Sequence, residues 1–299
     1  MTIFVTGALG QLGRDLVPQL LSRGHKVLAS DLAPEQSCLP EGVSYLPLDL
    51  TDAQAVSQAL TAAAPQAVIH CAAWTAVDAA EDVENNAAVW KVNAHATKNL
   101  ALVCRDLECK LVYISTDYVF SGLGETPWEA DSMDFDPQNI YGRTKLGGEM
   151  AVRELTQKHF IVRTAWVFGK HGGNFVSTML RLGRKLDSLR VVCDQIGTPT
   201  YTPDLARLLA DMIETEHYGT YHATNEGGFI SWYDFACEIF RQAGMDVRVS
   251  PVTTEEYGES KALRPKNSRL SKSKLTQMGF RPLPHWQDAL KRYLEELEV

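Results

Sequence analysis

The sequence predicts an α/β fold with a Rossmann-type, doubly wound parallel sheet and a smaller C-terminal domain. First, the apolar run Ile3–Val5 leads directly into a glycine-rich turn and a helical pattern. Second, short apolar runs then alternate with helical patterns as far as residue 163. Third, this alternation breaks after Trp166. Alternating strands and helices are typical of a parallel sheet whose ligands lie at the carboxyl ends of its strands.

The glycine-rich turn follows the first predicted strand. Gly7, Gly10 and Gly13 are spaced as G-x-x-G-x-x-G, with Gln11 and Leu12 between the last two. Glycines at this spacing permit a tight turn, close approach of the backbone to a pyrophosphate and close packing of the next helix. The free N–H groups at the start of that helix face the phosphates. In this position the pattern indicates a dinucleotide site.

Asp31 ends the second predicted strand, Val27–Asp31. An acidic residue at this place accepts hydrogen bonds from the adenosine ribose hydroxyls and repels a 2′-phosphate, which favours NAD over NADP. Arg14, just after the last glycine, favours the phosphate instead. NADPH and NADH therefore both remain possible, and the alternative interpretation of Asp31 is a plain turn residue.

Four further strands are predicted at residues 43–48, 67–70, 110–115 and 160–163. A helix capped by Thr51 or Asp52 precedes the fourth strand and runs to Ala63. The small residues Cys71-Ala72-Ala73 follow the fourth strand and let a cofactor lie against the backbone. A long helix through Asn93 to Arg105 then leads into the fifth strand.

The candidate catalytic residues are Thr116, at the end of the fifth strand, and Tyr141 and Lys145 in a helix that runs to about Lys158. A spacing of four places the tyrosine and the lysine on one helix face. A fixed cation lowers the pKa of a phenol from about 10 toward the range useful for proton transfer. Thr116 supplies a hydroxyl that holds a carbonyl oxygen. Together with a hydride donor, these residues predict a carbonyl-reducing site.

The chain divides, on this interpretation, into a dinucleotide-binding Rossmann domain at 1–165 and a mainly substrate-binding domain at 166–299, with some segments returning to the first. Asn174 opens a helix in the second part, and Gly122 to Asn139 form a loop long enough to be functional. We expect the active site in the cleft between the domains.

Composition limits the partners and the compartment. The net charge of −8 disfavours nucleic acid as a partner. No window approaches the roughly 18 apolar residues of a membrane helix, and the N-terminus lacks the features of a signal peptide, so a cytoplasmic protein without membrane contact is expected. The six cysteines are scattered, which predicts free and mostly buried thiols.

Taken together, these residues make the chain resemble the extended short-chain dehydrogenases that act on nucleotide sugars. Within them it is similar to the dTDP-4-dehydrorhamnose reductases over nearly its whole length. The more specific motifs are CAAWTAVD at 71–78, STDYVF at 115–120, RTAW at 163–166, DQIGTPT at 194–200 and RPKNS at 264–268. The resemblance implies reduction of the 4-keto group of dTDP-4-dehydro-β-L-rhamnose to dTDP-L-rhamnose, with hydride from the nicotinamide and a proton from Tyr141.

The resemblance also implies roles for individual residues. Those expected to contact the dinucleotide are Gly10, Gln11, Leu12, Asp31, Asp49, Leu50, Ala72 and Ala73, with Tyr141 and Lys145 at the nicotinamide ribose. Those expected to contact the dTDP-sugar are Thr75, Val77, Thr116, Asp117, Trp166 and Arg264, the last at the diphosphate. The alternative for Trp166 is a core aromatic residue, and the alternative for Arg264 is a surface ion pair.

Some members of this family bind Mg²⁺ at a dimer contact through acidic residues. No matching acidic cluster can be placed in this sequence, so no metal ligand is assigned. A Mg²⁺ requirement and the choice between monomer and homodimer both stay open.

Other functions occur on the same fold. Nucleotide-sugar dehydratases carry Thr-Asp-Glu where this chain has Thr116-Asp117-Tyr118, which argues against a dehydratase. Epimerases are harder to exclude from residues, but they retain their cofactor through turnover, whereas a reductase releases it. A regulatory subunit is the alternative from another class, because the β subunit of methionine adenosyltransferase resembles the same reductases. Retention of Thr116, Tyr141 and Lys145 weakens that alternative.

Overall fold

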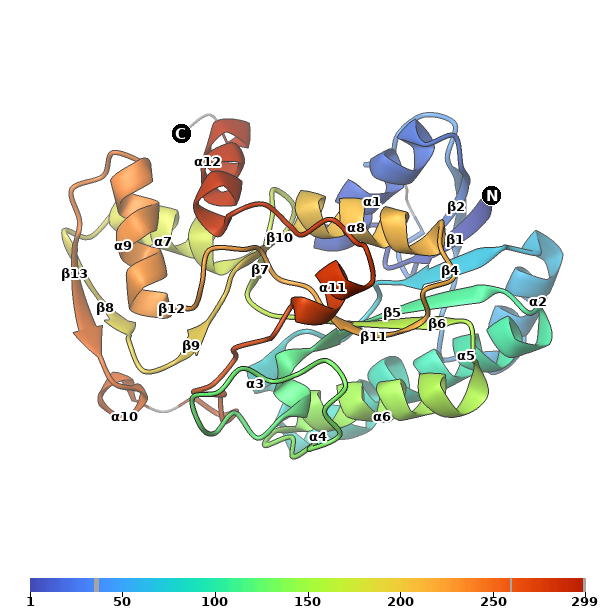
Figure 1. Ribbon diagram of the computed structural model, residues 1–299, viewed down its shortest axis with the longest axis horizontal. Coiled ribbons are helices and arrows are strands. Elements are labelled where there is room, and N and C mark those ends of the chain that lie inside the picture. The colour runs from blue at the N-terminus through green and yellow to red at the C-terminus, as the bar shows by residue number, and fades with distance from the viewer. Residues whose placement is uncertain (35–37, 259, 298–299) are drawn as a thin grey trace.

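The computed structural model describes residues 1–34, 38–258 and 260–297, and its centre is a seven-stranded sheet (Figure 1). The strand order is β11-β6-β5-β4-β1-β2-β3, and every neighbouring pair is parallel. The strands are β1 (Thr2–Thr6), β2 (Lys26–Asp31), β3 (Ser44–Pro47), β4 (Ala67–His70), β5 (Lys110–Thr116), β6 (His159–Thr164) and β11 (Gly219–His222). The chain moves outward in one direction from β1 and in the other from β4. The order therefore reverses between β1 and β4, where a doubly wound fold places its ligand.

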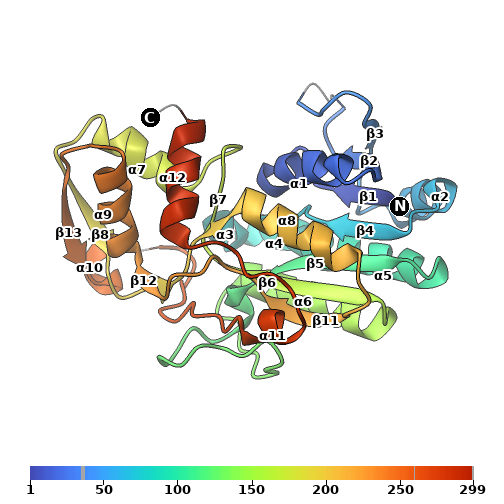
Figure 2. The ribbon, with the colours of Figure 1, turned by 45° about the horizontal axis from the view of Figure 1, so that its top comes forward.

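Helices cover both faces of this sheet (Figures 1 and 2). One face carries α1 (Gln11–Ser22) and α8 (Thr202–Ile213), and the other carries α2 (Ala53–Ala63), α5 (Ala96–Asp106) and α6 (Ile140–Leu155). Successive strand residues point to opposite faces, so Ile3 and Val5 pack with the first layer and Phe4 packs with the second. Burial on both faces explains why the strands are continuous apolar runs. The predicted fold class is confirmed.

The helical run before β5 contains one irregularity. It consists of α3 (Val77–Ala80), α4 (Val83–Trp90), a π-helical segment (Lys91–His95) and α5. In the π-helical segment, the Asn93 side chain accepts a hydrogen bond from the Trp74 amide at 2.8 Å and donates one to Thr144 Oγ1 at 3.0 Å. Asn93, in this π-helical turn, thus joins the segment after β4 to α6.

The remaining elements form a second lobe with its own core. They are β7 (Val167–Phe168), α7 (Phe175–Gly183), β8 (Ser188–Val192), β9 (Ile196–Gly197), β10 (Thr200–Tyr201), β12 (Ile230–Ser231), α9 (Trp232–Gln242), β13 (Arg248–Val252), α10 (Thr254–Tyr257) and α12 (Trp286–Glu296), whereas α11 (Ser273–Gln277) packs against the large sheet. The buried residues of this core all follow residue 165, whereas those of α8 and β11 belong to the core of the large sheet. Dividing the chain at residue 165, with α8, β11 and α11 assigned to the first unit, remains our proposal.

Two details differ from the sequence predictions. The helix that carries Tyr141 and Lys145 ends at Leu155 rather than near Lys158, because Thr156 is already extended with φ −134° and ψ 133° and leads into β6. All six cysteines are free, but only Cys104 and Cys109 are buried, so the prediction of mostly buried thiols is wrong. Scattered cysteines predict the absence of disulfides and say nothing about which thiols face water.

The helices of the described residues include none that is long and apolar enough to span a lipid bilayer.

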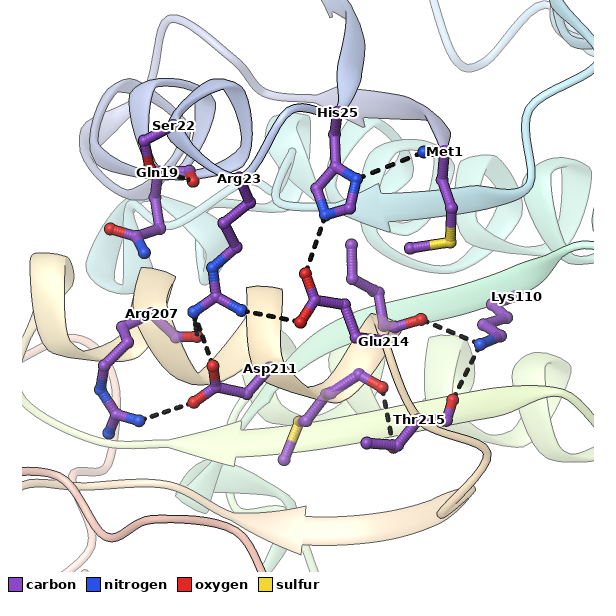
Figure 3. Close-up of polar contacts among 12 residues, drawn as sticks. Met1, Gln19, Ser22, Arg23, His25, Lys110, Arg207, Asp211, Glu214 and Thr215 are labelled. Carbon is purple, nitrogen blue, oxygen red and sulfur yellow. Dashed lines mark hydrogen bonds and ion pairs between the residues drawn. The ribbon is translucent and has the colours of Figure 1, made fainter.

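An ionic cluster joins α1 to α8 at the end of the sheet opposite the glycine turn (Figure 3). This rim cluster consists of Arg23, His25, Asp211 and Glu214. Arg23 lies 2.6 Å from Asp211 and 3.2 Å from Glu214, and His25 Nε2 lies 3.0 Å from Glu214. The cluster holds the two helices of one layer together at the rim of the sheet.

Candidate active site

A cavity of about 990 Å³ lies at the carboxyl ends of the strands and extends to the second lobe. Its walls come from the segments that follow the six strands β1 to β6, and its centre lies where the strand order reverses. The predicted site residues that line it are Gly7, Gly10, Gln11, Leu12, Asp31, Asp49, Leu50, Ala72, Ala73, Thr75, Val77, Thr116, Asp117, Tyr141, Lys145, Trp166 and Arg264. The fold therefore brings together residues from eight separate stretches of the chain.

Gly13 is the one predicted site residue that does not line the cavity. A Cβ atom on Gly13 would lie 2.2 Å from the carbonyl oxygen of Gly7, so this glycine lets α1 pack tightly beneath the turn. Gly7 has a positive φ of 64°, and a Cβ atom there would lie 2.5 Å from the Ala72 amide nitrogen. Only glycine allows such contact between the turn and the segment after β4.

The Asp31 carboxylate braces the glycine turn from the end of β2. It accepts hydrogen bonds from the amides of Leu9 at 3.0 Å and Leu32 at 2.8 Å. Its side chain thus has a turn-forming role as well as a place on the cavity wall. Arg14, the competing signal for NADP, does not line the cavity.

Thr116 and Tyr141 meet across the junction of β5 and α6. The Asn139 side chain caps α6 by accepting a hydrogen bond from the Gly142 amide at 2.7 Å. Gly142 in turn lies so close to the chain after β5 that a Cβ atom would be 2.3 Å from the carbonyl oxygen of Tyr118. This close approach holds the phenol of Tyr141 within hydrogen-bonding reach of the Thr116 hydroxyl.

The charge states of Tyr141 and Lys145 differ from the sequence-based expectation. The Lys145 ammonium donates a hydrogen bond to the Ile114 carbonyl oxygen at 2.6 Å and lies 4.2 Å from the centre of the Tyr113 ring. Burial lowers the pKa of Lys145 to about 7, with the charge of Glu149 opposing that shift. Burial raises the pKa of Tyr141, and the hydrogen bond with Thr116 opposes it. The predicted lowering of the phenol pKa by Lys145 is therefore wrong, because the ammonium is held against β5.

Asp117 is a buried carboxylate on the cavity wall. Its Oδ1 accepts a hydrogen bond from Thr116 at 3.0 Å, whereas its Oδ2 has no hydrogen-bond partner among the residues that the structure describes. Burial raises the pKa of Asp117 to about 6, with the hydroxyls of Ser268 and Thr116 opposing the shift. A buried unpaired acceptor is unfavourable by itself and suggests a role in binding.

Trp166 forms the wall on the side of the second lobe. Its φ of 51° is unusual for a residue other than glycine, and such strain is found at ligand sites more than elsewhere. Its ring stacks on Trp232 with centroids 3.7 Å apart. Trp232, at the start of α9, also lines the cavity and was not predicted from the sequence. Both rings are half-buried, so neither is a plain core aromatic residue.

A second part of the wall that was missed in the sequence is Gly172-Gly173-Asn174, which lines the cavity from the loop before α7. Asn174 caps α7 by accepting a hydrogen bond from the Ser177 amide at 3.0 Å. Its Nδ2 also lies 3.5 Å from Gln11 Oε1 on the opposite wall. The sequence indicated the helix start at Asn174, but no local signal indicated that it faces the glycine turn.

Arg264 lines the same cavity as Thr75 and Val77. Its guanidinium donates hydrogen bonds to Asp78 Oδ2 at 2.6 Å and to the Tyr118 hydroxyl at 3.3 Å. The ion pair expected by the alternative interpretation is therefore present, and the arginine also faces the cavity. Within residues 1–34, 38–258 and 260–297, no three His, Cys, Asp or Glu side chains gather as a metal site would require.

Known proteins are similar to this chain in sequence and in fold. The family described as the RmlD substrate binding domain matches residues 1–299. The dTDP-4-dehydrorhamnose reductase of Streptomyces griseus is 43% identical over 96% of this chain and 90% of that protein. The dTDP-4-keto-6-deoxy-D-glucose reductase of Streptomyces niveus is 39% identical over 96% of this chain and 94% of that protein.

A solved structure leads to the same family. The dTDP-4-dehydrorhamnose reductase of Bacillus anthracis, in complex with NADP, superposes with a TM-score of 0.89. It is 41% identical, and the match covers 99% of each chain. The family match over residues 1–299 and the identity to full-length relatives exceed what a shared fold alone would produce. This chain therefore belongs to the dTDP-4-dehydrorhamnose reductase family.

Proposed function

We propose that the protein reduces the 4-keto group of dTDP-4-dehydro-β-L-rhamnose to dTDP-L-rhamnose, with NADPH or NADH as the hydride donor. The observation that carries the proposal is the convergence of Thr116, Tyr141 and Lys145 on one cavity in a chain of this family. At about 990 Å³, the cavity lies at the upper end of the range usual for ligand sites. Such a site has room for a dinucleotide and a nucleotide sugar.

Tyr141 is the proposed proton donor. The nicotinamide, when bound, supplies the hydride to C4 of the sugar. The raised pKa of the Tyr141 phenol keeps its proton in place at neutral pH until negative charge develops on the ketone oxygen. The Thr116 hydroxyl, which lies within reach of the phenol, would orient that oxygen. General acid catalysis of this kind contributes about 10² to 10⁴ in rate.

Two roles were expected for Lys145, lowering the phenol pKa and holding the nicotinamide ribose, and we propose the second. Because its ammonium is anchored at the Ile114 carbonyl oxygen, it is placed to hold the nicotinamide ribose. We assign it no role in lowering the pKa of the phenol, because its ammonium is held against β5.

The sugar and diphosphate are proposed to lie against the second lobe. Trp166 and its stacked partner Trp232 offer an apolar wall for the deoxysugar. The unpaired oxygen of Asp117 offers an acceptor for a sugar hydroxyl. Arg264 offers a positive charge to the diphosphate, which would compete with Asp78 for the guanidinium.

A closely related 4-keto-6-deoxy sugar is the second candidate substrate. The relative from Streptomyces niveus is named for reduction of dTDP-4-keto-6-deoxy-D-glucose and is 39% identical. The two ketones differ in ring configuration, which is discriminated by pocket contacts. Whichever sugar is used, we place the reaction in the cytoplasm, with the protein as a monomer or a homodimer.

The test measures loss of reduced-nicotinamide absorbance with purified wild type and Tyr141→Phe, with both sugars and with NADPH and NADH in parallel. We expect wild-type turnover with dTDP-4-dehydrorhamnose and a kcat about 10² to 10⁴ lower in Tyr141→Phe. Tyr118→Phe removes another phenol hydroxyl from the cavity, one that receives a hydrogen bond from Arg264, and we expect it to lower kcat by less than about tenfold.

Two results would contradict this proposal. Equal kcat in Tyr141→Phe and wild type would remove the proton donor. No oxidation of either coenzyme by wild type would favour the regulatory-subunit alternative, which predicts stimulation of a partner enzyme instead.

A further inference from the structure

We propose that Glu149 is a positioning residue for the reduction: it clamps the end of β5 that carries Thr116 to α6 and keeps Lys145 charged. This inference rests on the proposed function, because it concerns the same site. Glu149 does not line the cavity and is 0% exposed, so it acts only through other residues.

Glu149 is the third member of a series on α6. Tyr141, Lys145 and Glu149 follow one another at intervals of four, which places them on the helix face that packs on the sheet. The first two line the cavity and the third lies one turn farther inside. The helix thus carries a proton donor, a cation and a buried anion in a row.

The Glu149 carboxylate joins α6 to two strands. Its Oε1 accepts hydrogen bonds from Ser115 Oγ at 2.6 Å and from Arg163 Nε at 2.8 Å, and its Oε2 accepts one from Arg163 Nη2 at 2.7 Å. Ser115 and Arg163 are register partners on β5 and β6. Because Thr116 directly follows Ser115, this clamp sets the distance between the Thr116 hydroxyl and the Tyr141 phenol. A reacting pair needs such support to stay within hydrogen-bonding reach.

Arg163 is itself held in place, so the clamp is rigid. Its side chain is 0% exposed, and its Nη1 donates a hydrogen bond to the Ala130 carbonyl oxygen at 3.3 Å. The guanidinium lies 4.9 Å from the ring centre of Phe120 and 5.0 Å from that of Phe135. His222 Nε2 on β11 lies 3.4 Å from Nη1. The arginine therefore cannot turn away without breaking contacts to the loop at 122–139.

The second part of the proposal concerns charge. The titratable groups that surround Lys145 are Glu149 on α6, His70 and Cys71 at the end of β4, and Tyr113 on β5, and Tyr141 lies one helical turn away. Burial lowers the pKa of His70 to about 3 and raises that of Cys71 to about 12, so both are neutral at pH 7. Burial also raises the pKa of both tyrosines.

Glu149 is the member of this group that carries negative charge at neutral pH. Its hydrogen bonds with Arg163 hold its pKa below the usual range despite burial. Arg153 on α6, 3.2 Å from Oε2, adds to that effect. The carboxylate thus opposes the loss of the Lys145 proton that burial promotes. Without it, Lys145 and Arg163 would be two buried cations lacking a shared anion.

The experiment compares Glu149→Gln, Glu149→Asp and wild type in NADPH affinity, by fluorescence titration, and in kcat, both over a range of pH. Lys145 loses its charge as pH rises through its pKa, so both quantities fall on the alkaline side. We expect this fall to occur about one pH unit lower in Glu149→Gln, with kcat at pH 8 reduced about tenfold and the sugar KM little changed. Glu149→Asp keeps the charge and is expected to restore the position of the fall.

Asp204→Asn is the matched control. Asp204 is also a buried carboxylate held by an arginine, with Arg292 at 2.7 and 3.0 Å, but it does not line the cavity. We expect it to lower thermal stability without moving the alkaline fall. An unmoved fall in Glu149→Gln, or an equal shift in Asp204→Asn, would overturn the charge role.

Ser115→Ala tests the clamp separately, and serves if Glu149→Gln does not fold. It leaves the ion pair intact and removes the hydroxyl link, so we expect a lower kcat, an unchanged NADPH affinity and no movement of the alkaline fall. An unchanged kcat would overturn the clamp. If wild type binds NADPH but reduces neither sugar, the proposed function fails while the pH dependence of NADPH affinity still tests Glu149.

Discussion

The pair Glu149–Arg163 and the rim cluster use the same chemistry at opposite ends of the sheet. Arg163 lies 2.7 Å from Glu149, and Arg23 lies 2.6 Å from Asp211, so distance does not distinguish them. Both side chains of the first pair are 0% exposed, whereas those of Arg23, Asp211 and Glu214 are 20 to 42% exposed. Water solvates and screens the charges of an exposed ion pair, so the pair contributes little to stability. A buried charge has no water to solvate it and is stabilised only by its partner and its hydrogen bonds.

The two groups also differ in what they support. The buried pair holds Ser115, next to Thr116, and therefore links stability to the chemistry of the cavity. The rim cluster joins α1 to α8 at the far end of the sheet, and none of its residues lines the cavity. Changes to the buried pair should therefore alter stability and activity together, and changes to the rim cluster should alter stability alone.

Arg163→Met should have the largest effect on stability. It leaves the Glu149 carboxylate buried without its main partner, and removing one partner of a buried pair typically costs about 3 to 5 kcal/mol. Urea unfolding followed by circular dichroism measures the change in the free energy of unfolding. The double variant Arg163→Met/Glu149→Leu removes both charges and should recover most of the loss. A loss below about 1 kcal/mol in the single variant would mean that the buried pair contributes no more to the free energy of unfolding than an exposed pair of the rim cluster does.

Asp117→Asn should have an intermediate effect on stability and should raise the free energy of unfolding rather than lower it. Because the folded-state pKa of Asp117 is raised from 3.8 to about 6, wild type loses stability as pH rises through that window. The full penalty is present above about pH 6, and two pKa units correspond to on the order of 2 to 3 kcal/mol. Asparagine carries no charge, so the variant should be more stable than wild type at pH 7.5. At pH 5 the stability difference between variant and wild type should be smaller.

Activity provides the control for Asp117→Asn, since we expect a higher sugar KM if its free oxygen binds the substrate. Urea unfolding at pH 5 and pH 7.5 gives the stability difference. Equal stability differences at the two pH values would show that burial does not raise the pKa of the Asp117 carboxylate.

Asp211→Asn should have the smallest effect. Asp211 accepts hydrogen bonds from Arg23 at 2.6 Å and Arg207 at 2.7 Å, but all three side chains are partly exposed. We expect a loss of less than about 1 kcal/mol in the free energy of unfolding, decreasing further in high salt, with kcat unchanged. A loss above about 2 kcal/mol that salt does not reduce would mean that the rim cluster behaves as a buried group.

Much of the sheet was predictable because its signals are local. The strand Ala67–His70 and the helix end at Ala63 agree with the structure to the residue, and of the two predicted caps, Thr51 and Asp52, the structure uses Asp52. A buried parallel strand is a short apolar run, and a cap needs an oxygen before the first turn. The strand β11 was not predicted. Its residues, Gly-Thr-Tyr-His, carry no clear apolar run, and its place is set by pairing with β6.

The active site was likewise predictable only where its features depend on local sequence. Tyr141 and Lys145 follow from helical spacing, but the direction of the ammonium does not. That direction depends on the Ile114 carbonyl oxygen and the Tyr113 ring, which lie on another element. The sequence-based expectation about the phenol pKa assumed that two side chains on one helix face also face each other, and here the sheet beneath them decides otherwise.

The sequence by itself determined the doubly wound fold, the glycine turn and the pairing of a tyrosine with a lysine on one helix, because each depends on neighbours within a few positions. Only the tertiary structure decided that Glu149 meets Arg163, that Trp166 stacks on Trp232 and that Arg264 pairs with Asp78. The last of these contacts joins positions 186 apart in the chain. Contacts of that kind depend on how layers and lobes pack, and no periodic pattern in the chain encodes them.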